Sequence, residues 1–441
     1  MVGQMTGELR ADEPRGDNRD CAIVTPVAFD SHGAVALGMA IDASGKRIRI
    51  SGTRFADAAA SNGHELESTA TQVFIPSANA VSSVSDFFEF VAYCIREFIH
   101  KHELVDGEDG CIEGAVIPLG VSIGLPVSRQ RNPQSLKQNE RCPPLSCTIA
   151  EVSKEDSLDL GNRDVARHLH DAILRNYLPV RITSVTNNVV SSLIAAKFSN
   201  KDTCVAASFN HGVNAAYVKR QCNNGQDTCS EFEVVNTEIG RFGSESGTSS
   251  SSVLPMTMWD NRIDRESRNP GARRFEKLVA DQYLGEIVRN LITDFMDQQQ
   301  LFSVNCDVSK INESYSFHTA YMAPIMEDTS GDLASVGDLF DTVFGISTDL
   351  SDRQIIRALC DCVASRASRL SGAALAALVS GTRPVSPCTV ALSGVLLNSK
   401  PIFNATMATM HKQLSNDKAT EVYIQPRYSE LLGAALSAVR S

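Results

Sequence analysis

Apolar residues recur along this chain in two patterns that predict different secondary structure. Short segments with few charged residues predict strands, and 116–123 has the composition of a strand buried in a parallel sheet. Longer segments repeat apolar residues every three or four positions, which is the spacing of a buried helix face. Strands are predicted at 116–123, 180–185, 204–209, 388–394 and 421–426. Helices are predicted from Ser85 as a capping residue to Phe98, and at 162–177, 353–380 and 400–414.

The stretch 236–289 has the most informative pattern. An Asn-Pro-Gly sequence at 269–271 breaks regular structure, because proline lacks a backbone donor and glycine tolerates positive φ. Beyond it, one buried helix is predicted by apolar residues that recur every four positions: Phe275, Val279, Tyr283, Ile287, Leu291 and Phe295. Glu276 falls in the first turn of that helix, where the helix dipole favours a carboxylate. Considered alone, Glu276 is an ordinary first-turn residue.

Composition narrows the class of protein. A chain of 441 residues is too long for one hydrophobic core and suggests two or three domains. A formal net charge of −11 argues against an electrostatic grip on nucleic acid or on an anionic membrane. No apolar run approaches the roughly 18 residues of a membrane span. The chain begins with polar residues of mixed charge, unlike a secretory signal peptide, and we expect a partly disordered tail over residues 1–35.

The 12 cysteines do not indicate a metal site or a disulfide framework. Cys360 and Cys362 are close in sequence, but no two cysteines form the paired C-x-x-C spacing of a zinc site. Scattered free thiols are typical of proteins in a reducing compartment. We therefore expect free cysteines, no bound metal, and a location in the cytoplasm or the nucleus.

Two motifs in the stretch 236–289 carry a resemblance to a known family. One is Asn-Thr-Glu, which ends at Glu238, and the other is Phe-Glu-Lys, which contains Glu276. Together they resemble the large-domain sugar site of eukaryotic hexokinases, and the resemblance implies that both glutamates bind sugar hydroxyls. The other sugar contacts that it implies are Ser128, Asn187 and Asn214. A Thr-Lys pair that the family carries beyond the Ser128 segment is absent here.

The position of the general base differs from the family. Hexokinases read Asn-Asp-Thr after the strand predicted at 180–185, and the Asp takes the proton from the sugar 6-hydroxyl. This chain has Asn188 at that position. An amide cannot accept a proton at neutral pH, although it can hydrogen-bond a hydroxyl. General-base catalysis contributes about 10²–10⁴ in rate. Without the resemblance, Asn187 and Asn188 are an ordinary polar turn after a strand.

The first phosphate-binding hairpin of the family is altered. Asp42 and Arg49 keep the family residue types, but Gly45 is the one glycine left where the family has two in succession. Adjacent glycines let the backbone approach a phosphate closely. Lys46 and Arg47 add positive charge at the tip, so an exposed basic hairpin is the alternative interpretation.

The second phosphate turn and the adenosine turn are altered as well. Asn210 and His211 replace a Gly and a Thr, and Gly212 remains. His211 is also explained as a solvated turn residue. Ser393 and Gly394 stand where the family has the Asp and Gly that hold adenosine, and the glycine-rich turn near the C-terminus is replaced at 428–435.

The resemblance implies an α/β fold of the actin-like ATPase (ribonuclease H-like) type, with a sugar cleft between two domains. The small domain is expected at 36–187, with 428–441 packing on it, and the large domain at 188–427. The activity of the family is ATP-dependent transfer of phosphate to a hexose.

The altered positions favour a catalytically inactive or severely impaired hexokinase-like protein. Such a protein resembles the regulatory hexokinase-like proteins of filamentous fungi, which act in carbon metabolism, and would bind a hexose such as glucose together with protein partners. One alternative is an active hexokinase that phosphorylates glucose or fructose at O6 and requires ATP and Mg²⁺. Another is an interaction scaffold without sugar binding.

Overall fold

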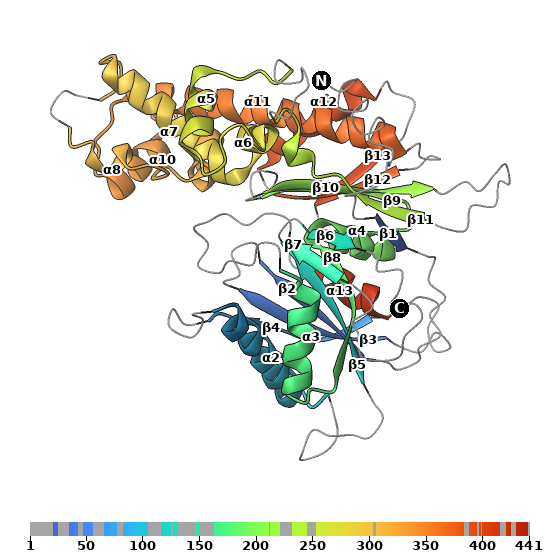
Figure 1. Cartoon of the computed structure of the whole chain (residues 1–441). Helices are drawn as coiled ribbons and strands as arrows, with labels where there is room; N and C mark the ends of the chain where they lie inside the picture. Colours follow the sequence, from blue (N-terminus) through green and yellow to red (C-terminus); the bar gives the residue numbers. More distant parts are fainter. Residues whose placement is uncertain are drawn as a thin grey trace. The chain divides into compact units, whose positions relative to one another are not determined.

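The computed structural model describes the chain in segments, which together form two compact units (Figure 1). The described residues are 21–24, 35–42, 47–55, 66–76, 83–104, 116–124, 127–130, 146–149, 163–210, 212–220, 232–244, 253–302, 306–382, 388–394, 397, 399–414, 420–424 and 429–439. The first unit takes its described residues from Pro14–Ala206, Ala216–Asn236 and Gln425–Ser441. The second unit contains Ala207–Ala215 and the described part of Thr237–Ile424.

The first unit contains a five-stranded sheet with the order β4-β3-β2-β5-β8. Its strands are β2 (Val35–Ile41), β3 (Ile48–Phe55), β4 (Leu66–Phe74), β5 (Ile117–Ile123) and β8 (Val180–Asn187). β3 pairs antiparallel with β2 and β4, whereas β5 pairs parallel with β2 and β8. The strands predicted at 116–123 and 180–185 are confirmed. A smaller sheet pairs β6 (Val127–Gln130) with β7 (Ser146–Ile149).

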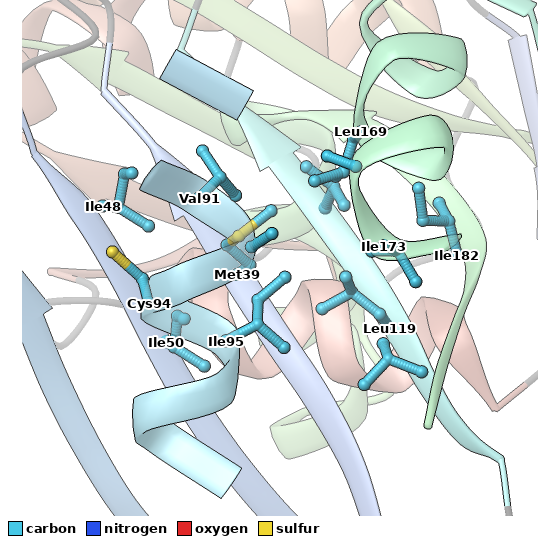
Figure 2. Packing of buried hydrophobic residues seen from close by; sticks show 14 of the residues in the cluster. Met39, Ile48, Ile50, Val91, Cys94, Ile95, Leu119, Leu169, Ile173 and Ile182 are labelled. Carbon is cyan, nitrogen blue, oxygen red and sulfur yellow. The ribbon is translucent and has the colours of Figure 1, made fainter. Parts of the chain in front are cut away.

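Helices α2 (Val84–Lys101) and α3 (Val165–Arg175) pack against one face of this sheet. Alternate strand residues such as Leu37, Met39 and Ile50 meet the apolar faces of the helices in one buried cluster, and Figure 2 shows Met39 close to Val91 and Ile95. The N-cap of α2 is Ser83 and not Ser85, because the Ser83 hydroxyl accepts the Asp86 N–H.

Helix α13 (Ser429–Ala438) packs against β2 and β5 at positions between the cluster residues. A Cβ on Gly38 would lie 2.0 Å from the Leu431 carbonyl oxygen, and one on Gly120 would lie 1.9 Å from that of Ala434. α13 also packs closely on α4 (Asn188–Ser199). The two glycines therefore allow the helix backbone to lie directly on the strands.

A six-stranded sheet has the order β1-β11-β10-β9-β12-β13. Its strands are β1 (Cys21–Val24), β9 (Thr203–Phe209), β10 (Val213–Arg220), β11 (Phe232–Asn236), β12 (Cys388–Ser393) and β13 (Thr420–Ile424). Without β1, the strands follow the order third, second, first, fourth, fifth along the chain, which is also the order in the five-stranded sheet. The two sheets therefore share one topology, although the sequence shows no internal repeat.

The second unit carries most of the remaining helices. They are α5 (Met258–Glu266), α6 (Arg274–Val279), α7 (Asp281–Asp297), α8 (Ser309–Asn312), α9 (Met322–Glu327), α10 (Ala334–Leu339), α11 (Leu350–Thr382) and α12 (Lys400–Gln413). The single helix predicted from Phe275 to Phe295 is wrong, since the chain breaks at Ala280 into α6 and α7. Ala280 has a ψ of 144°, and the Asp281 N–H donates to the distant Asn210 carbonyl.

The cysteines depart from the expectation of free thiols. Cys204 and Cys388 each take part in a disulfide, whereas Cys94, Cys306, Cys360 and Cys362 are free. The two bonded cysteines lie at the starts of β9 and β12, which are neighbours in the six-stranded sheet. None of the helices in the described segments combines the length and the hydrophobicity that a membrane span requires.

Candidate functional site

Three segments of the second unit bring together the glutamates and an asparagine singled out in the sequence. Asn214 lies in β10, Glu238 precedes the short 3-10 helix η1 (Ile239–Arg241), and Glu276 lies in the first turn of α6. The Asn214 amide donates from Nδ2 to Glu238 Oε1 at 3.2 Å. The N–H of Val213, next to Asn214, donates to Glu276 Oε2 at 2.9 Å.

The Glu276 carboxylate is the best-defined group of this site. Its residue is 4% exposed, and Oε2 accepts from both Val213 N–H and Arg273 Nη1. Oε1 accepts no hydrogen bond from any described residue. Burial raises the pKa of Glu276, Glu238 raises it further, and Arg273 and the Val213 N–H act in the opposite direction. A buried carboxylate whose second oxygen has no hydrogen-bond donor among the described residues can accept a hydrogen bond from a ligand hydroxyl.

Two residues have strained backbone at this site. Glu238 has a φ of 49° and Arg273 a φ of 50°, both in the left-handed region that non-glycine residues seldom adopt. The Arg273 N–H donates to Ser244 Oγ at 2.8 Å, which helps to hold that conformation. Sequence reasoning missed Arg273, and the one available signal was its position three residues before Glu276.

Gly240 shows how closely the segments approach. A Cβ at this position would lie 2.5 Å from the Val213 carbonyl oxygen and 3.0 Å from Glu276 Oε2. The absence of a side chain therefore allows η1 to pack against both the start of β10 and the carboxylate.

A buried ion pair supports the start of α6. Lys277 Nζ contacts Asp264 Oδ1 at 2.5 Å and donates to the Asn269 carbonyl at 2.7 Å. Asp264 also accepts the Gly271 N–H at 3.1 Å. These bonds tie α5, the Asn-Pro-Gly turn and α6 together, and burial lowers the pKa of Lys277. We assign Lys277 a structural role, because its side chain is 1% exposed and faces Asp264.

Asn188, at the position of the general base, and the expected sugar contact Asn187 both lie in the first unit. Asn187 is the N-cap of α4, and its Oδ1 accepts the Val189 N–H at 3.0 Å. Asn188 Oδ1 accepts the same N–H at 2.9 Å. Both side chains therefore act as helix-capping acceptors, and neither amide can take up a proton at neutral pH.

The first phosphate hairpin is formed by β2 and β3. Arg47 N–H donates to Asp42 Oδ1 at 3.3 Å, and Arg49 Nη1 forms an ion pair with Glu430 Oε1 at 2.9 Å. Glu430 lies in the first turn of α13, within the segment that replaces the glycine-rich C-terminal turn. Gly45 lies outside the described residues.

The second phosphate turn contacts the adenosine turn within the second unit. Asn210 Nδ2 donates to Ser208 Oγ at 3.0 Å and to Ser393 Oγ at 3.2 Å. Gly394 follows β12, where a Cβ would lie 3.2 Å from the Phe209 carbonyl oxygen. Gly212 directly precedes β10. Two substituted positions, 210 and 393, are therefore hydrogen-bonded to each other.

The remaining expected residues are only partly described. Ser128 lies in β6 with Thr148 of β7 opposite it. His211 and Tyr428 lie outside the described residues, as do the altered positions 43–46.

Comparison with solved structures establishes the fold. A hexokinase from Schistosoma mansoni, solved in complex with glucose, covers 100% of this chain with a TM-score of 0.78 at 20% identity, and 94% of that chain is matched. A second hexokinase crystal structure covers 99% of the chain and 92% of its own length, with a TM-score of 0.72 at 19% identity. The chain has the two-domain α/β hexokinase fold of the actin-like ATPase type.

Comparison of sequences establishes the family. Hexokinase-2 of Candida albicans is 26% identical over 379 residues, which are 84% of this chain and 72% of that protein. Hexokinase-9 of Oryza sativa subsp. japonica is 28% identical over 444 residues, which cover 96% of this chain and 82% of that protein. Two sequence models of the hexokinase family match this chain, one over residues 4–198 and the other over residues 204–440. This chain belongs to the hexokinase family.

Proposed function

We propose that this protein binds a hexose and transfers phosphate to it very slowly or not at all. In this role it would act as a hexose-responsive regulator, like the regulatory hexokinase-like proteins of filamentous fungi. The observation that carries the proposal is the combination of a Glu276 Oε1 that accepts no hydrogen bond from the described residues with an amide at position 188.

The geometry around Glu276 supports binding of a polyhydroxylated ligand. Glu238 lies near enough to raise the pKa of Glu276, and Asn214 adds an amide bonded to Glu238. Clustered carboxylate and amide groups suit the several hydroxyls of a hexose, because carboxylates accept and amides both donate and accept. The Schistosoma mansoni hexokinase of the same fold was solved with glucose, which makes glucose the first ligand to test.

Several contacts support weak phosphoryl transfer. Asn188 cannot serve as a general base, and its amide oxygen is engaged by the Val189 N–H. Asn210 is hydrogen-bonded to Ser393, and Arg49 is paired with Glu430. Phosphoryl transfer depends on positioned groups that stabilise charge, so changes at several of these positions weaken it together.

A regulatory role requires more than binding. Glucose can shift the conformation of the protein only if it binds one state more tightly than another. We propose that the bound state is the one that protein partners recognise, in the cytoplasm or the nucleus.

Two measurements on the purified full chain test this proposal. Calorimetry with glucose is expected to show binding that is lost in Glu238→Ala. A coupled assay with glucose, ATP and Mg²⁺ is expected to show no turnover above background in the same preparation. Robust turnover that disappears in Glu238→Ala would identify an active hexokinase, and absence of glucose binding would remove the sensor.

The variant Asn188→Asp refines the second measurement. It restores a carboxylate at the base position, whose contribution in enzymes is about 10²–10⁴ in rate. We expect less than about 10-fold stimulation, because the contacts at Asn210 and Arg49 are unchanged. Substantial rescue would show that the altered turns matter little.

A further inference from the structure

Arg273 is a charged residue at this site, and it lies outside the two sequence motifs that carry the resemblance to hexokinases. It lies directly before α6, and its Nη1 contacts Glu276 Oε2 at 3.2 Å. Its side chain is 19% exposed, whereas that of Glu276 is 5% exposed. The guanidinium therefore reaches a buried carboxylate from the more exposed side of the site.

The backbone conformation that places the Arg273 guanidinium beside Glu276 is unfavourable. Its φ of 50° is in the left-handed region, which non-glycine residues seldom adopt. The hydrogen bond from its N–H to Ser244 Oγ helps to hold that conformation. A conformation of this kind persists only when surrounding contacts determine it, which indicates a fixed position for the arginine.

We propose that Arg273 is a positioning residue for the hexose site, whose guanidinium holds Glu276 Oε2 so that Oε1 is presented to a ligand hydroxyl. The inference rests on the proposed hexose binding. Val213 N–H shares the same oxygen, so the carboxylate is fixed by one donor from β10 and one from the residue before α6.

The charges around Glu276 explain why a cation is needed to keep its carboxylate ionised. Burial and the neighbouring Glu238 both raise the pKa of Glu276. Tyr283 on α7 is neutral, since burial raises its pKa, and Lys277 on α6 is paired with Asp264 of α5. Arg273 is thus the cation that directly contacts the carboxylate among the described residues, and it favours the ionised form that accepts hydrogen bonds.

Glucose calorimetry from pH 5 to pH 8 tests this role. The variants are Arg273→Met, which removes the guanidinium, and Arg273→Lys, which restores a positive charge. Arg273→Gln keeps a donor without charge, and it serves as the second uncharged variant if Arg273→Met does not fold. Arg262→Met is the matched control, because Arg262 forms an exposed ion pair with Glu266.

We expect Arg273→Met to weaken glucose binding about 10-fold near pH 7.5, the size of one lost charge-assisted hydrogen bond. Affinity in the wild type is expected to fall as pH decreases through the pKa of Glu276, and this fall should occur at higher pH in Arg273→Met and Arg273→Gln. Arg273→Lys should restore part of the affinity, and Arg262→Met should match the wild type.

The outcomes separate the two proposals. If the folded wild type does not bind glucose, both the proposed function and the inference fail. If the wild type binds glucose and the uncharged variants reproduce its affinity at every pH, the role of Arg273 alone is overturned. A purely structural role would lower thermal stability without moving the pH dependence of binding, which would also overturn it.

Discussion

Position 188 illustrates how one atom can change the chemistry of a site. Asn188 and an aspartate have nearly the same shape, and either can accept the Val189 N–H. Only the carboxylate can accept a proton near neutral pH. Glu276 represents the opposite case, because its carboxylate remains despite a buried position that penalises charge. A ligand that donates a hydrogen bond to the Glu276 carboxylate would account for a carboxylate at this buried position.

The variant Glu276→Gln tests this trade-off between stability and binding. Burial raises the folded-state pKa of Glu276 above its unfolded value, so this group favours folding at low pH and loses that contribution as pH rises through the folded pKa. We expect the variant to be at least as stable as the wild type at pH 7.5, with the wild type gaining relative stability toward pH 5. Glucose affinity should fall about 10–100-fold.

Thermal melts at both pH values and glucose calorimetry check this prediction. Glu266→Gln serves as a control, because Glu266 lies on α5 and its side chain is exposed. A variant that melted well below the wild type at pH 7.5 yet bound glucose normally would show that Glu276 is a structural residue.

Among the elements, the pairing of α4 with α13 depends on one glycine. A Cβ at Gly433 would lie 1.7 Å from the Ser191 carbonyl oxygen, so the two helix backbones are in direct contact. α4 begins at Asn188, and α13 carries the Glu430 that pairs with Arg49. The packing of these two helices thereby fixes the positions of two residues that distinguish this chain.

We predict that Gly433→Ala destabilises the protein by about 3 kcal/mol, because a backbone carbonyl cannot yield to the new methyl group. Urea unfolding measures the change. Gly381→Ala is the matched control: Gly381 also lies in a helix, α11, but no neighbouring atom of the described residues lies within 4 Å of its added Cβ. That variant should be neutral or more stable by about 0.5–1 kcal/mol. Equal effects of the two substitutions would contradict the close packing of α4 on α13.

At the scale of the whole molecule, two sheets share one strand order, and the described residues divide into two units. The candidate hexose contacts Asn214, Glu238 and Glu276 all belong to the second unit. A ligand that binds only the folded state stabilises it by mass action. Hexose binding should therefore be visible as a change in stability as well as in heat.

We predict that glucose at 100 times its dissociation constant raises the free energy of unfolding by about 2.7 kcal/mol. ATP with Mg²⁺ is expected to add little, since Asn210 and Arg49 already have partners within the protein. Urea unfolding with each ligand, alone and together, measures both effects. Stabilisation by ATP alone comparable to that by glucose would contradict the weak nucleotide binding inferred from these contacts.

The sequence by itself determined some of the elements, because the spacing of apolar residues is a local property of strands and helices. It predicted the strands at β5, β8, β9 and β12, and helices that the structure places as α2, α3, α11 and α12, with small differences at their ends. It also supplied the Asn-x-Glu and Phe-Glu-Lys motifs that identified the family, since these combine residue types that packing alone does not require.

Only the tertiary structure decided which groups meet. The break at Ala280 depends on a hydrogen bond from Asp281 to Asn210, and the bond between Asn210 and Ser393 joins positions 183 residues apart. The conformation of Arg273 depends in the same way on Ser244. Hydrogen bonds of this kind form between segments that folding brings together, so no periodicity along the chain records them. The residue types of the candidate site were therefore readable from sequence, whereas the partner of each oxygen was not.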